Sequence, residues 1–312
     1  MEANDDLPRW FLAHEVDVVF NIAEGCHGAH RESQVPALLE LLGIPFTGSN
    51  SLTLALALDK AKTKQVLAYE GVPTPAWQLF PTLDTVLNPR LAFPLIVKPN
   101  GEGSAKGIVR DSVVWDAATL RGQVRRIHAQ YQQEALVEEF IDGTELTVGV
   151  LGNCDPDVLP ILEIDFSECR RSGEFFYSWP MKEYQGDASR GLTPAFHCPA
   201  RLPEGVAAQV RAAVLRAHRA LGCRDLSRTD VRLRRDGVPF VLEVNPLPGL
   251  DPQESNFPLM TTAAGISYGA VINRLVDLAL ARHGARTPEP SSRVLAESRT
   301  VPGVWDSRRG RS

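Results

Sequence analysis

Two acidic residues, Asp230 and Glu243, stand where a β-hairpin would set them side by side. The stretch 226–245 is predicted to form two strands around Asp236-Gly237, a pair that suits a two-residue type I′ turn because both central residues then need a positive φ. With that turn, Asp230 lies directly opposite Glu243, and facing residues share one side of the sheet. Like charges in this position destabilise a sheet, so their pairing needs an explanation.

A cation between the two carboxylates would remove the repulsion. The same register sets Arg228 opposite Asn245, on the face that carries Asp230 and Glu243. Two carboxylates and an amide oxygen are hard ligands that suit Mg²⁺ or Mn²⁺. Composition alone favours the alternative, a solvated hairpin face with chance acids, until the rest of the chain is considered.

A polar, glycine-rich loop at residues 100–107 follows a predicted strand that ends in Lys98-Pro99. Small residues let backbone N–H groups approach an anion closely, Ser104 adds a hydroxyl donor, and Lys98 and Lys106 add positive charge. This composition fits a phosphate-covering loop between two strands. It matches neither the Walker A pattern nor a GxGxxG turn that opens a helix, and an ordinary flexible hairpin is the alternative.

Residues 137–145 combine a predicted strand with acids, in the order Val137-Glu138-Glu139-Phe140-Ile141-Asp142-Gly143-Thr144-Glu145. A strand edge offers a backbone N–H and C=O that can bind the edge of a purine, and an acid can accept hydrogen bonds from ribose hydroxyls. The stretch therefore suits a nucleotide hinge. A plain strand and turn would carry the same residues.

Composition bounds the class of protein. The chain has 312 residues, 44% of them hydrophobic, which is enough for two or three domains. A net charge of −5 gives no electrostatic footprint for nucleic acid or anionic membrane. No apolar run reaches the roughly 18 residues of a membrane span, and the acidic start does not resemble a secretory signal. Five scattered cysteines without a CxxC indicate reduced thiols, so we expect a cytoplasmic protein.

Alternating helices and strands are expected to position these segments. Near the N-terminus, a strand at residues 16–21, a helix at 32–42 and a short strand or turn at 44–48 form a βαβ pattern, which is usually parallel and right-handed. Further along, we expect helices at 59–70, 206–221 and 270–281, and strands at 94–99, 108–109, 136–140 and 145–151. Residues 285–312 lack apolar periodicity and are expected to form a disordered tail.

Phosphate loop, acidic hinge and Asp…Glu-x-Asn hairpin, in that order, resemble the ATP-grasp superfamily and, within it, the D-alanine–D-alanine ligase family. The resemblance covers about residues 18–280, and its strongest match is Leu242-Glu243-Val244-Asn245-Pro246-Leu247-Pro248-Gly249. Weaker matches are Val97-Lys98-Pro99, Gly103-Ser104 and Gly107 in the loop, Gly43-Ile44-Pro45-Phe46-Thr47-Gly48-Ser49, and Asp59-Lys60-Ala61-Lys62-Thr63-Lys64.

The resemblance implies an α+β protein with the ATP-grasp fold and three subdomains. A shortened N-terminal α/β subdomain would span residues 1–49, a central one with the phosphate loop 50–136, and a C-terminal one with hinge, lid and metal site 137–284. ATP would bind between the last two. The lid candidate is the segment from about 167 to 197.

The resemblance also implies roles for single residues. ATP would be held by Lys60 and Lys98 at the phosphates, by Glu138, Phe140 and Ile141 at the adenine, and by Glu145 at the ribose. Two Mg²⁺ ions, with Mn²⁺ as an alternative, would be held by Asp230, Glu243 and Asn245. The reacting groups would be served by Arg228 and the N–H of Gly249 at the tetrahedral intermediate, Ser104 in the phosphate loop, Ser255 at the carboxylate of the second amino acid, and Lys182 at the γ-phosphate.

The amino-acid side departs from the family pattern. The family opens with a Gly-rich strand and an acid that binds the ammonium group of the first D-alanine, and this sequence lacks both; either translation starts upstream or the N-terminal subdomain is shortened. Where the family has a His-Gly pair, this chain has Ala23-Glu24-Gly25. We propose that Glu24 binds a substrate ammonium group instead, and an acid in a solvated loop is the alternative.

Two further departures lie in the phosphate loop and the lid. The loop has Ala105-Lys106 where the family usually has a second Ser and an apolar residue. The lid is one residue longer than the family pattern and has Glu183 where a Tyr is expected, so Tyr184 could take that place by a one-residue slip. These differences indicate a relative with altered amino-acid specificity at least as strongly as the cell-wall enzyme.

The expected function is ATP-dependent joining of two small amino acids, with D-alanine as the leading candidate, through an acylphosphate that yields dipeptide, ADP and phosphate for peptidoglycan synthesis. One alternative is an ATP-grasp carboxylate–amine ligase with other amino acids outside the cell wall. Another is a nucleotide-binding relative without catalysis. ATP and small amino acids are the expected partners, nucleic acid and membrane are not, and a homodimer is left open.

Overall fold

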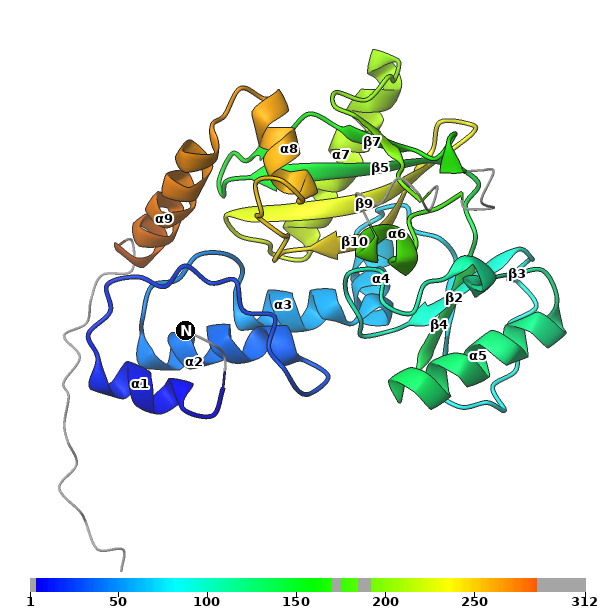
Figure 1. Ribbon diagram of the computed structural model, residues 1–312, viewed down its shortest axis with the longest axis horizontal. Coiled ribbons are helices and arrows are strands. Elements are labelled where there is room, and N and C mark those ends of the chain that lie inside the picture. The colour runs from blue at the N-terminus through cyan, green and yellow to red at the C-terminus, as the bar shows by residue number, and fades with distance from the viewer. Residues whose placement is uncertain (1–3, 170–174, 185–191, 285–312) are drawn as a thin grey trace, which may run out of the picture.

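Two antiparallel sheets, a small one and a large one, frame the molecule (Figure 1). The structure is a computed structural model, and it describes residues 4–169, 175–184 and 192–284. The tail expected at 285–312 and parts of the expected lid lie outside the described residues. A mostly helical N-terminal segment lies below the large sheet in the view of Figure 1.

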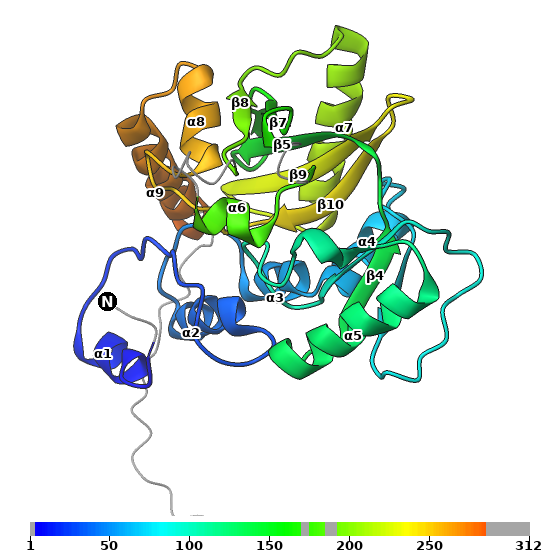
Figure 2. The ribbon, with the colours of Figure 1, turned by 45° about the vertical axis from the view of Figure 1, so that its right-hand side comes forward.

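The small sheet has the strand order β1-β4-β2-β3. Its strands are β1 (Trp77–Phe80), β2 (Leu95–Pro99), β3 (Val113–Val114) and β4 (Ala135–Glu139). Helix α5 (Ala117–Tyr131) covers the side away from the large sheet (Figures 1 and 2), where Leu120, Val124 and Ile127 join the apolar strand residues. Asp116 caps this helix by accepting two backbone N–H bonds.

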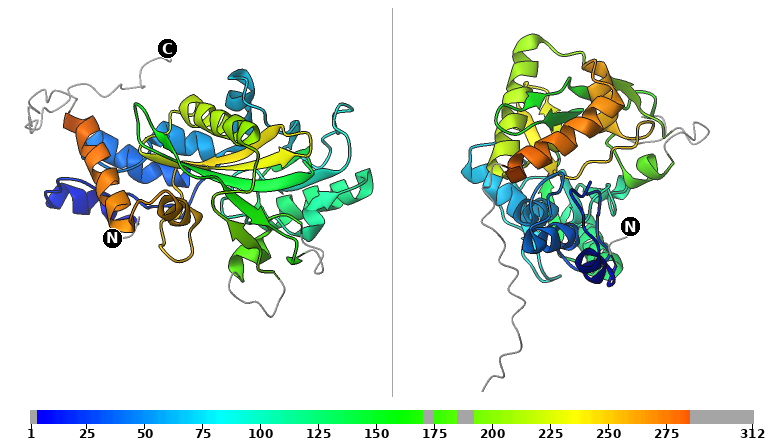
Figure 3. Two further views of the ribbon diagram at one scale, coloured as in Figure 1. Left: turned by 90° about the horizontal axis from the view of Figure 1, so that it is seen from above. Right: turned by 90° about the vertical axis from the view of Figure 1, so that its left-hand side faces the viewer.

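The large sheet has the order β10-β9-β5-β7-β8, with β6 also paired to β5. Its strands are β5 (Gly143–Leu151), β6 (Asp157–Val158), β7 (Leu162–Asp165), β8 (Ala195–His197), β9 (Leu226–Arg234) and β10 (Pro239–Asn245). The helices around it are α4 (Lys60–Tyr69), α6 (Trp179–Glu183), α7 (Glu204–Ala220), α8 (Asn256–Ala263) and α9 (Tyr268–Gly284). Helices α7 and α8 lie on opposite faces of this sheet (Figure 3).

Strand alternation decides which residues face the site. On β5, Leu146, Val148 and Val150 pack into the core with α7. Thr147 therefore points to the other face, where it pairs with Asp230 of β9. The apolar face secures the sheet, and the opposite face is left to carry polar side chains.

The β9–β10 hairpin differs from its expected turn. Gly237 donates to Arg234 O at 2.9 Å, and Arg234 donates to Val238 O at 3.0 Å, so the loop contains three residues and not two. Gly237 adopts φ +87°, which fits a three-residue hairpin loop with glycine in the left-handed region. The Asp236-Gly237 type I′ turn is therefore wrong.

A β-bulge restores the expected register further along β10. Val241 pairs with Val231, but the next pair is Glu243 with Asp230, so Leu242 is the extra residue. The one-residue error at the turn is cancelled by this one-residue bulge. Glu243 still faces Asp230, and Asn245 still faces Arg228, as the sequence predicted.

The N-terminal segment departs from the expected βαβ unit. It contains α1 (Leu7–Ala13), the 3₁₀ turn η1 (Arg31–Ser33), α2 (Gln34–Leu42) and α3 (Ser51–Leu58). The strand expected at 16–21 is only a single parallel bridge between Val19 and Phe46. Within the described residues no further strand pairs with this bridge, so the ladder does not extend.

Other boundaries also move. The return strand expected at 108–109 is β3 at Val113–Val114, because the 3₁₀ turn η2 (Arg110–Ser112) comes first. Helix α3 was not expected, and it is separated from α4 by Asp59, whose side chain caps α4 at Lys62 N (3.0 Å). Strand β4 runs across the subdomain boundary expected at 136, because its whole length pairs in the small sheet.

Among the residues described, no single helix is long and apolar enough to cross a membrane. Helices α8 and α9 meet that criterion only as a pair, and they bend by 103° at the break between them.

Candidate active site

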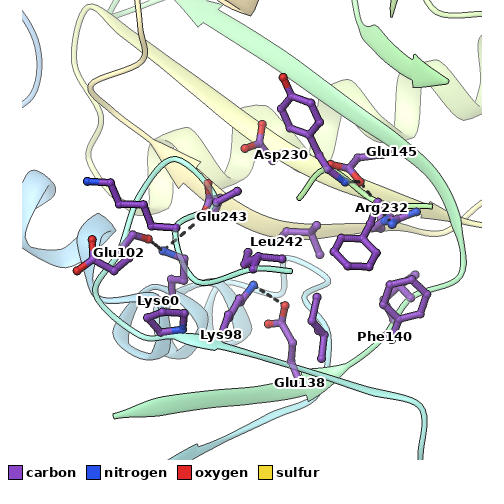
Figure 4. Close-up of a pocket in the computed structure, with 18 of the residues that line it drawn as sticks. Lys60, Lys98, Glu102, Glu138, Phe140, Glu145, Asp230, Arg232, Leu242 and Glu243 are labelled. Atoms are coloured by element: carbon purple, nitrogen blue, oxygen red, sulfur yellow. Dashed lines mark hydrogen bonds and ion pairs between the residues drawn. The ribbon is translucent and has the colours of Figure 1, made fainter. Parts of the chain in front are cut away.

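A pocket between the two sheets is lined by side chains from both (Figure 4). Nine residues that the sequence singled out line it: Lys60, Lys98, Glu138, Phe140, Ile141, Glu145, Lys182, Asp230 and Glu243. They come from segments more than 180 residues apart in the chain (60 to 243) and from both sheets. We call this cavity the nucleotide pocket.

Asp230 is held by a dense set of donors. Arg228 donates from Nε and Nη2 to the two carboxylate oxygens at 3.1 and 3.0 Å. The Thr147 hydroxyl donates to Oδ1 at 2.6 Å. The guanidinium of Arg228 is thus turned toward Asp230 in a two-point ion pair, and its pKa is raised because Asp230 outweighs the effect of burial.

Glu243 is surrounded by cations. Lys60 Nζ lies 3.4 Å from Glu243 Oε2. Burial alone would raise the pKa of this carboxyl, but Lys60, Lys98, Lys182 and Arg228 outweigh burial and hold the pKa well below its usual range. The repulsion expected between the two acids is therefore compensated by fixed positive side chains.

The donor set fits a hard divalent cation. Asn245 Nδ2 lies 3.4 Å from Asp230 Oδ2 and 3.2 Å from Glu243 Oε1, so the three side chains converge. A half-turn of the amide would present its oxygen beside the carboxylates. No described group of three or more His, Cys, Asp or Glu side chains forms a metal cage, so the remaining ligands would come from phosphate or water oxygens.

Glu138 is paired on both of its oxygens in the floor of the nucleotide pocket. Lys98 donates to Oε1, and Lys64 Nζ lies 2.8 Å from Oε2. Burial would raise the pKa of Glu138, but the two lysines outweigh burial and lower it. Its carboxylate is thus neutralised by two lysines, and the neighbouring backbone N–H groups of Glu139 and Phe140 already donate to Ala76 O (2.9 Å) and Pro94 O (3.0 Å).

The opposite end of this pocket is aromatic. Phe140, Phe175 and Phe176 pack edge to face, with ring centroids 5.2 to 6.1 Å apart. Arg232 lies over the Phe140 ring at 5.3 Å and pairs with Glu145 at 3.4 Å. Burial raises the pKa of Glu145 despite Arg232. This end offers flat apolar walls beside an acid.

The loop at 100–107 takes its shape from three small residues. Ser104 and Ala105 adopt φ +54° and +56°, so the left-handed backbone lies at two non-glycine residues. Gly107 adopts φ +80°, and a Cβ there would meet Pro99 at 2.5 Å. Lys106 N donates to Gly103 O at 3.0 Å, which closes the loop over the nucleotide pocket.

A second pocket adjoins the first. Lys106, Tyr177 and Lys182 line both pockets. The other predicted site residues line this second one: Glu24, Ser104, Arg228, Asn245, Gly249 and Ser255. We call it the amino-acid pocket. Every site residue expected from the sequence thus lines one of two connected cavities.

Gly249 and Ser255 meet closely at the edge of the amino-acid pocket. A Cβ at position 249 would lie 2.7 Å from Ser255 Oγ, so only glycine allows this hydroxyl to approach the backbone. Ser255 is the N-cap of α8, and its side chain does not cap the helix.

Comparison with known proteins identifies the family. A family model described as the D-ala D-ala ligase C-terminus matches residues 65–277. A D-alanine–D-alanine ligase of Pelotomaculum thermopropionicum is 34% identical over 291 residues, covering 90% of this chain and 86% of the relative. The chain belongs to the D-alanine–D-alanine ligase family. An uncharacterised protein of Sinorhizobium fredii is 38% identical over 272 residues, covering 87% of this chain and 77% of that protein.

Solved structures agree with this family. A D-alanine–D-alanine ligase from Bacillus anthracis complexed with ATP superposes with a TM-score of 0.73 at 28% identity, covering 91% of this chain and 86% of that one. The VanG D-Ala:D-Ser ligase from Enterococcus faecalis superposes with a TM-score of 0.67 at 25% sequence identity, covering 85% of this chain and 74% of that one. The expected family and the α+β ATP-grasp fold are both confirmed.

One acidic residue of the site in this D-alanine–D-alanine ligase family member was not predicted from the sequence. Glu32, in η1, lines the amino-acid pocket together with Glu24. Burial raises its pKa to about 7, Arg31 lowers it, and Glu24 raises it further. Arg31 itself is turned to the phosphate loop, where it pairs with Glu102 at 3.3 Å. The only sequence signal for Glu32 was its position at the start of a predicted helix.

The lid residues of this family member are partly rearranged relative to expectation. Lys182 lies over the Tyr177 ring at 5.4 Å, and burial and Arg228 lower its pKa. Trp179 N donates to Ile108 O at 2.9 Å, which ties α6 to the end of the phosphate loop. Tyr177, and not Tyr184, lines the two pockets. The one-residue slip expected at Tyr184 stays a prediction.

Proposed function

We propose that this protein joins two D-alanine molecules at the expense of ATP, forming a dipeptide, ADP and phosphate. One observation carries the proposal: a pocket with a paired-acid and lysine end opens directly into a second pocket with Arg228 and Ser255, and Lys182 lies at their junction. Such a junction suits transfer of a phosphoryl group from a nucleotide to a carboxylate. Membership of the D-alanine–D-alanine ligase family supports the same activity.

ATP would lie along the nucleotide pocket. Its base would pack beside Phe140 and Ile141, its ribose hydroxyls would donate to Glu145, and Lys60 and Lys98 would bind its phosphates. The apolar walls at one end and the lysines at the other support this direction. Ser104 and the backbone of its loop would cover the phosphates. Glu138 would act through its ion pair with Lys98 more than by touching the base.

Asp230, Glu243 and Asn245 would hold two Mg²⁺ ions. When bound, the metal neutralises charge on the phosphates and polarises the transferring group. Arg228 pairs with both oxygens of Asp230 and also lines the amino-acid pocket, so it lies between the proposed metal ligands and the reacting carboxylate. The chain's own cations, Lys182 among them, face the same phosphates.

The chemistry has two steps. A carboxylate oxygen of the first amino acid attacks the γ-phosphorus, a new O–P bond forms, and ADP leaves with the bridging oxygen. The neutral amine of the second amino acid then attacks the acyl carbon, the C–O bond to phosphate breaks, and the departing phosphate takes the proton from the nitrogen. Arg228 and the N–H of Gly249 would bind the oxyanion between these events. Tyr177 and Lys182, which line both pockets, would help to keep water from the acylphosphate.

The two substrates need opposite charges. Ser255 would bind the carboxylate of the second amino acid. Glu24 at the rim and Glu32 further in would attract ammonium groups, because both line the amino-acid pocket and Glu32 has no ion-pair partner among the described residues. Glu24 is exposed, so its contribution is the weaker of the two.

One assay tests the proposal. The protein is incubated with MgATP and a panel of D- and L-amino acids, and phosphate release and products are measured. Release with D-alanine, together with D-alanyl-D-alanine, is expected. Release only with other amino acids would instead show a ligase of different specificity, and ATP binding without release would show a nucleotide-binding protein.

A further inference from the structure

A buried lysine lies behind the nucleotide pocket. Lys64, on α4, is fully buried, with 0% of its surface exposed. Charged lysines are almost never fully buried unless they are paired. Its ammonium group lies 2.8 Å from Glu138 Oε2 and donates to the Thr74 hydroxyl at 2.8 Å. Burial lowers its pKa to about 8, and Glu138 raises it in part.

The polar chain continues from Thr74 to the large sheet. The Thr74 hydroxyl donates to the Val241 carbonyl at 2.8 Å, and Val241 N donates to Pro73 O at 2.8 Å. Val241 is the last paired residue before the bulge at Leu242. The Pro73-Thr74 segment therefore fastens β10 at the point where its register changes.

The other end of the chain lies in the small sheet. Glu138 sits on β4 beside Ile96 of β2, and its second oxygen binds Lys98. Lys64 thus bridges a strand of the small sheet to a strand of the large sheet, underneath the cavity between them. Glu138, Leu242 and Glu243 line that cavity, whereas Lys64 stands behind its wall.

The β-bulge at Leu242 is the part of the site that this bridge would position. Strand residues normally alternate between the two faces, yet Leu242 and Glu243 are neighbours in sequence and both line the nucleotide pocket. The bulge makes that possible. Any shift of the Val241 carbonyl would move an apolar pocket wall and a proposed metal ligand together.

We infer that Lys64 is a positioning residue that couples the nucleotide hinge to the metal-binding end of the site through the buried chain Glu138–Lys64–Thr74–Val241. The inference rests on the proposed function only in naming the pocket's ligands. Its consequence is that nucleotide binding and Mg²⁺ binding reinforce each other through the protein as well as through the phosphates.

The test removes one link of the chain and spares the buried ion pair. Thr74→Val keeps the side-chain shape and the Lys64–Glu138 contact but loses the bond to Val241. ADP affinity is measured by calorimetry with and without Mg²⁺. The gain in affinity that Mg²⁺ gives is expected to fall about 3- to 10-fold, the effect of one hydrogen bond to a site.

Thr63→Val is the matched control. Thr63 lies one residue before Lys64, is 1% exposed, and donates to the Leu56 carbonyl at 2.8 Å, so it loses an equivalent buried bond away from the pocket. Both variants should lose similar stability in urea, but only Thr74→Val should weaken the Mg²⁺ effect. Equal Mg²⁺ effects in the two variants would overturn the inference.

Calorimetry also separates this inference from the proposed function. If the wild-type protein released no phosphate with any amino acid, the ligase activity would fail, while the Mg²⁺ effect on ADP would still report on Lys64. Lys64→Met extends the test where it folds, and it should reduce the Mg²⁺ effect at least as much as Thr74→Val.

Discussion

The nucleotide pocket and the amino-acid pocket use charge in opposite ways. In the nucleotide pocket, the buried Glu138 and the half-buried Glu243 are compensated by lysines, and their pKa values are lowered. In the amino-acid pocket, Glu32 has a raised pKa of about 7 and Glu24 is exposed. The first pocket is organised before its ligand arrives, whereas the second awaits a positive group from its ligand.

This difference teaches where specificity can vary. A preorganised cluster such as Lys64–Glu138–Lys98 is costly to alter, because removing one member leaves a buried charge unpaired. Acids at an open pocket can be exchanged with little cost to the fold. Glu24, one of the positions that depart from the expected family pattern, falls in the second class.

The largest effect is expected from Glu243→Gln. Loss of the central carboxylate should reduce turnover by about 1000-fold or more, because it removes both charge and a metal ligand. Phosphate release in the presence of D-alanine checks it. Asp236→Asn, at the exposed tip of the same hairpin, is the control and should keep the wild-type rate. Near-normal turnover in Glu243→Gln would remove the metal site from the mechanism.

Arg228→Met should come next. It is expected to lower kcat about 100- to 1000-fold, as for other groups that bind an oxyanion, with ADP affinity in the absence of Mg²⁺ little changed. Steady-state kinetics and calorimetry measure the two quantities. Arg234→Met, at the exposed end of the same strand, controls for loss of an arginine. A fall in nucleotide affinity without a fall in kcat would contradict the role given to Arg228.

Glu32 should make amino-acid binding depend on pH. Because its pKa is about 7, the carboxyl gains a proton as pH falls below 7 and loses attraction for an ammonium group. KM for D-alanine should rise about 10-fold between pH 8 and pH 6, and Glu32→Gln should flatten that dependence. Glu254→Gln, an acid of the same pocket, is the matched control. A parallel profile in Glu32→Gln would refute this assignment.

The raised pKa of Glu32 also makes the stability of the fold depend on pH. The folded protein holds a proton on Glu32 that the unfolded chain, with a pKa near 4.5, has already released. The free energy of unfolding contributed by this group therefore falls as pH rises from about 4.5 to 7. Urea denaturation at pH 5 and pH 8 should show Glu32→Gln gaining stability relative to wild type at the higher pH only.

The smallest effect is expected from Glu24→Ala. The exposed carboxylate should change KM for D-alanine only about 3-fold, because solvent screens its charge, and kcat should not change. Raising the salt concentration should remove the difference. An unchanged KM at low salt would exclude Glu24 from substrate binding, and an effect larger than that of Glu32→Gln would reverse the order of the two acids.

Sequence reasoning worked where chemistry and strand alternation act together. The facing of Asp230 and Glu243 followed from alternation and hairpin pairing, even though the turn was assigned wrongly. The bulge at Leu242 carries no local signal, because nothing in Val-Leu-Glu distinguishes a bulged strand from a regular one. The predicted pairing of Asp230 with Glu243 is therefore correct only because the wrong turn and the missed bulge shift the register by one residue in opposite directions.

Tertiary packing decided the rest. Lys64 lies in a stretch of alternating lysines that suggests a solvated helix face, and only the docking of α4 between the sheets buries it. The pKa of Glu32 likewise depends on segments far away in the chain. The strand at 16–21 had the right composition, but a strand needs a neighbour, and one bridge is all that the described residues supply.

The paired loop and bulge of the β9–β10 hairpin also bear on how the site can change over time. A one-residue deletion at the hairpin tip would be taken up by the loop, because Arg234 and Val238 can close a two-residue loop as well as a three-residue one. Loss of Leu242 would remove the bulge and still leave Glu243 opposite Asp230, but the nucleotide pocket would lose an apolar wall. The facing acids therefore tolerate changes in hairpin length, whereas the apolar wall beside them depends on the bulge.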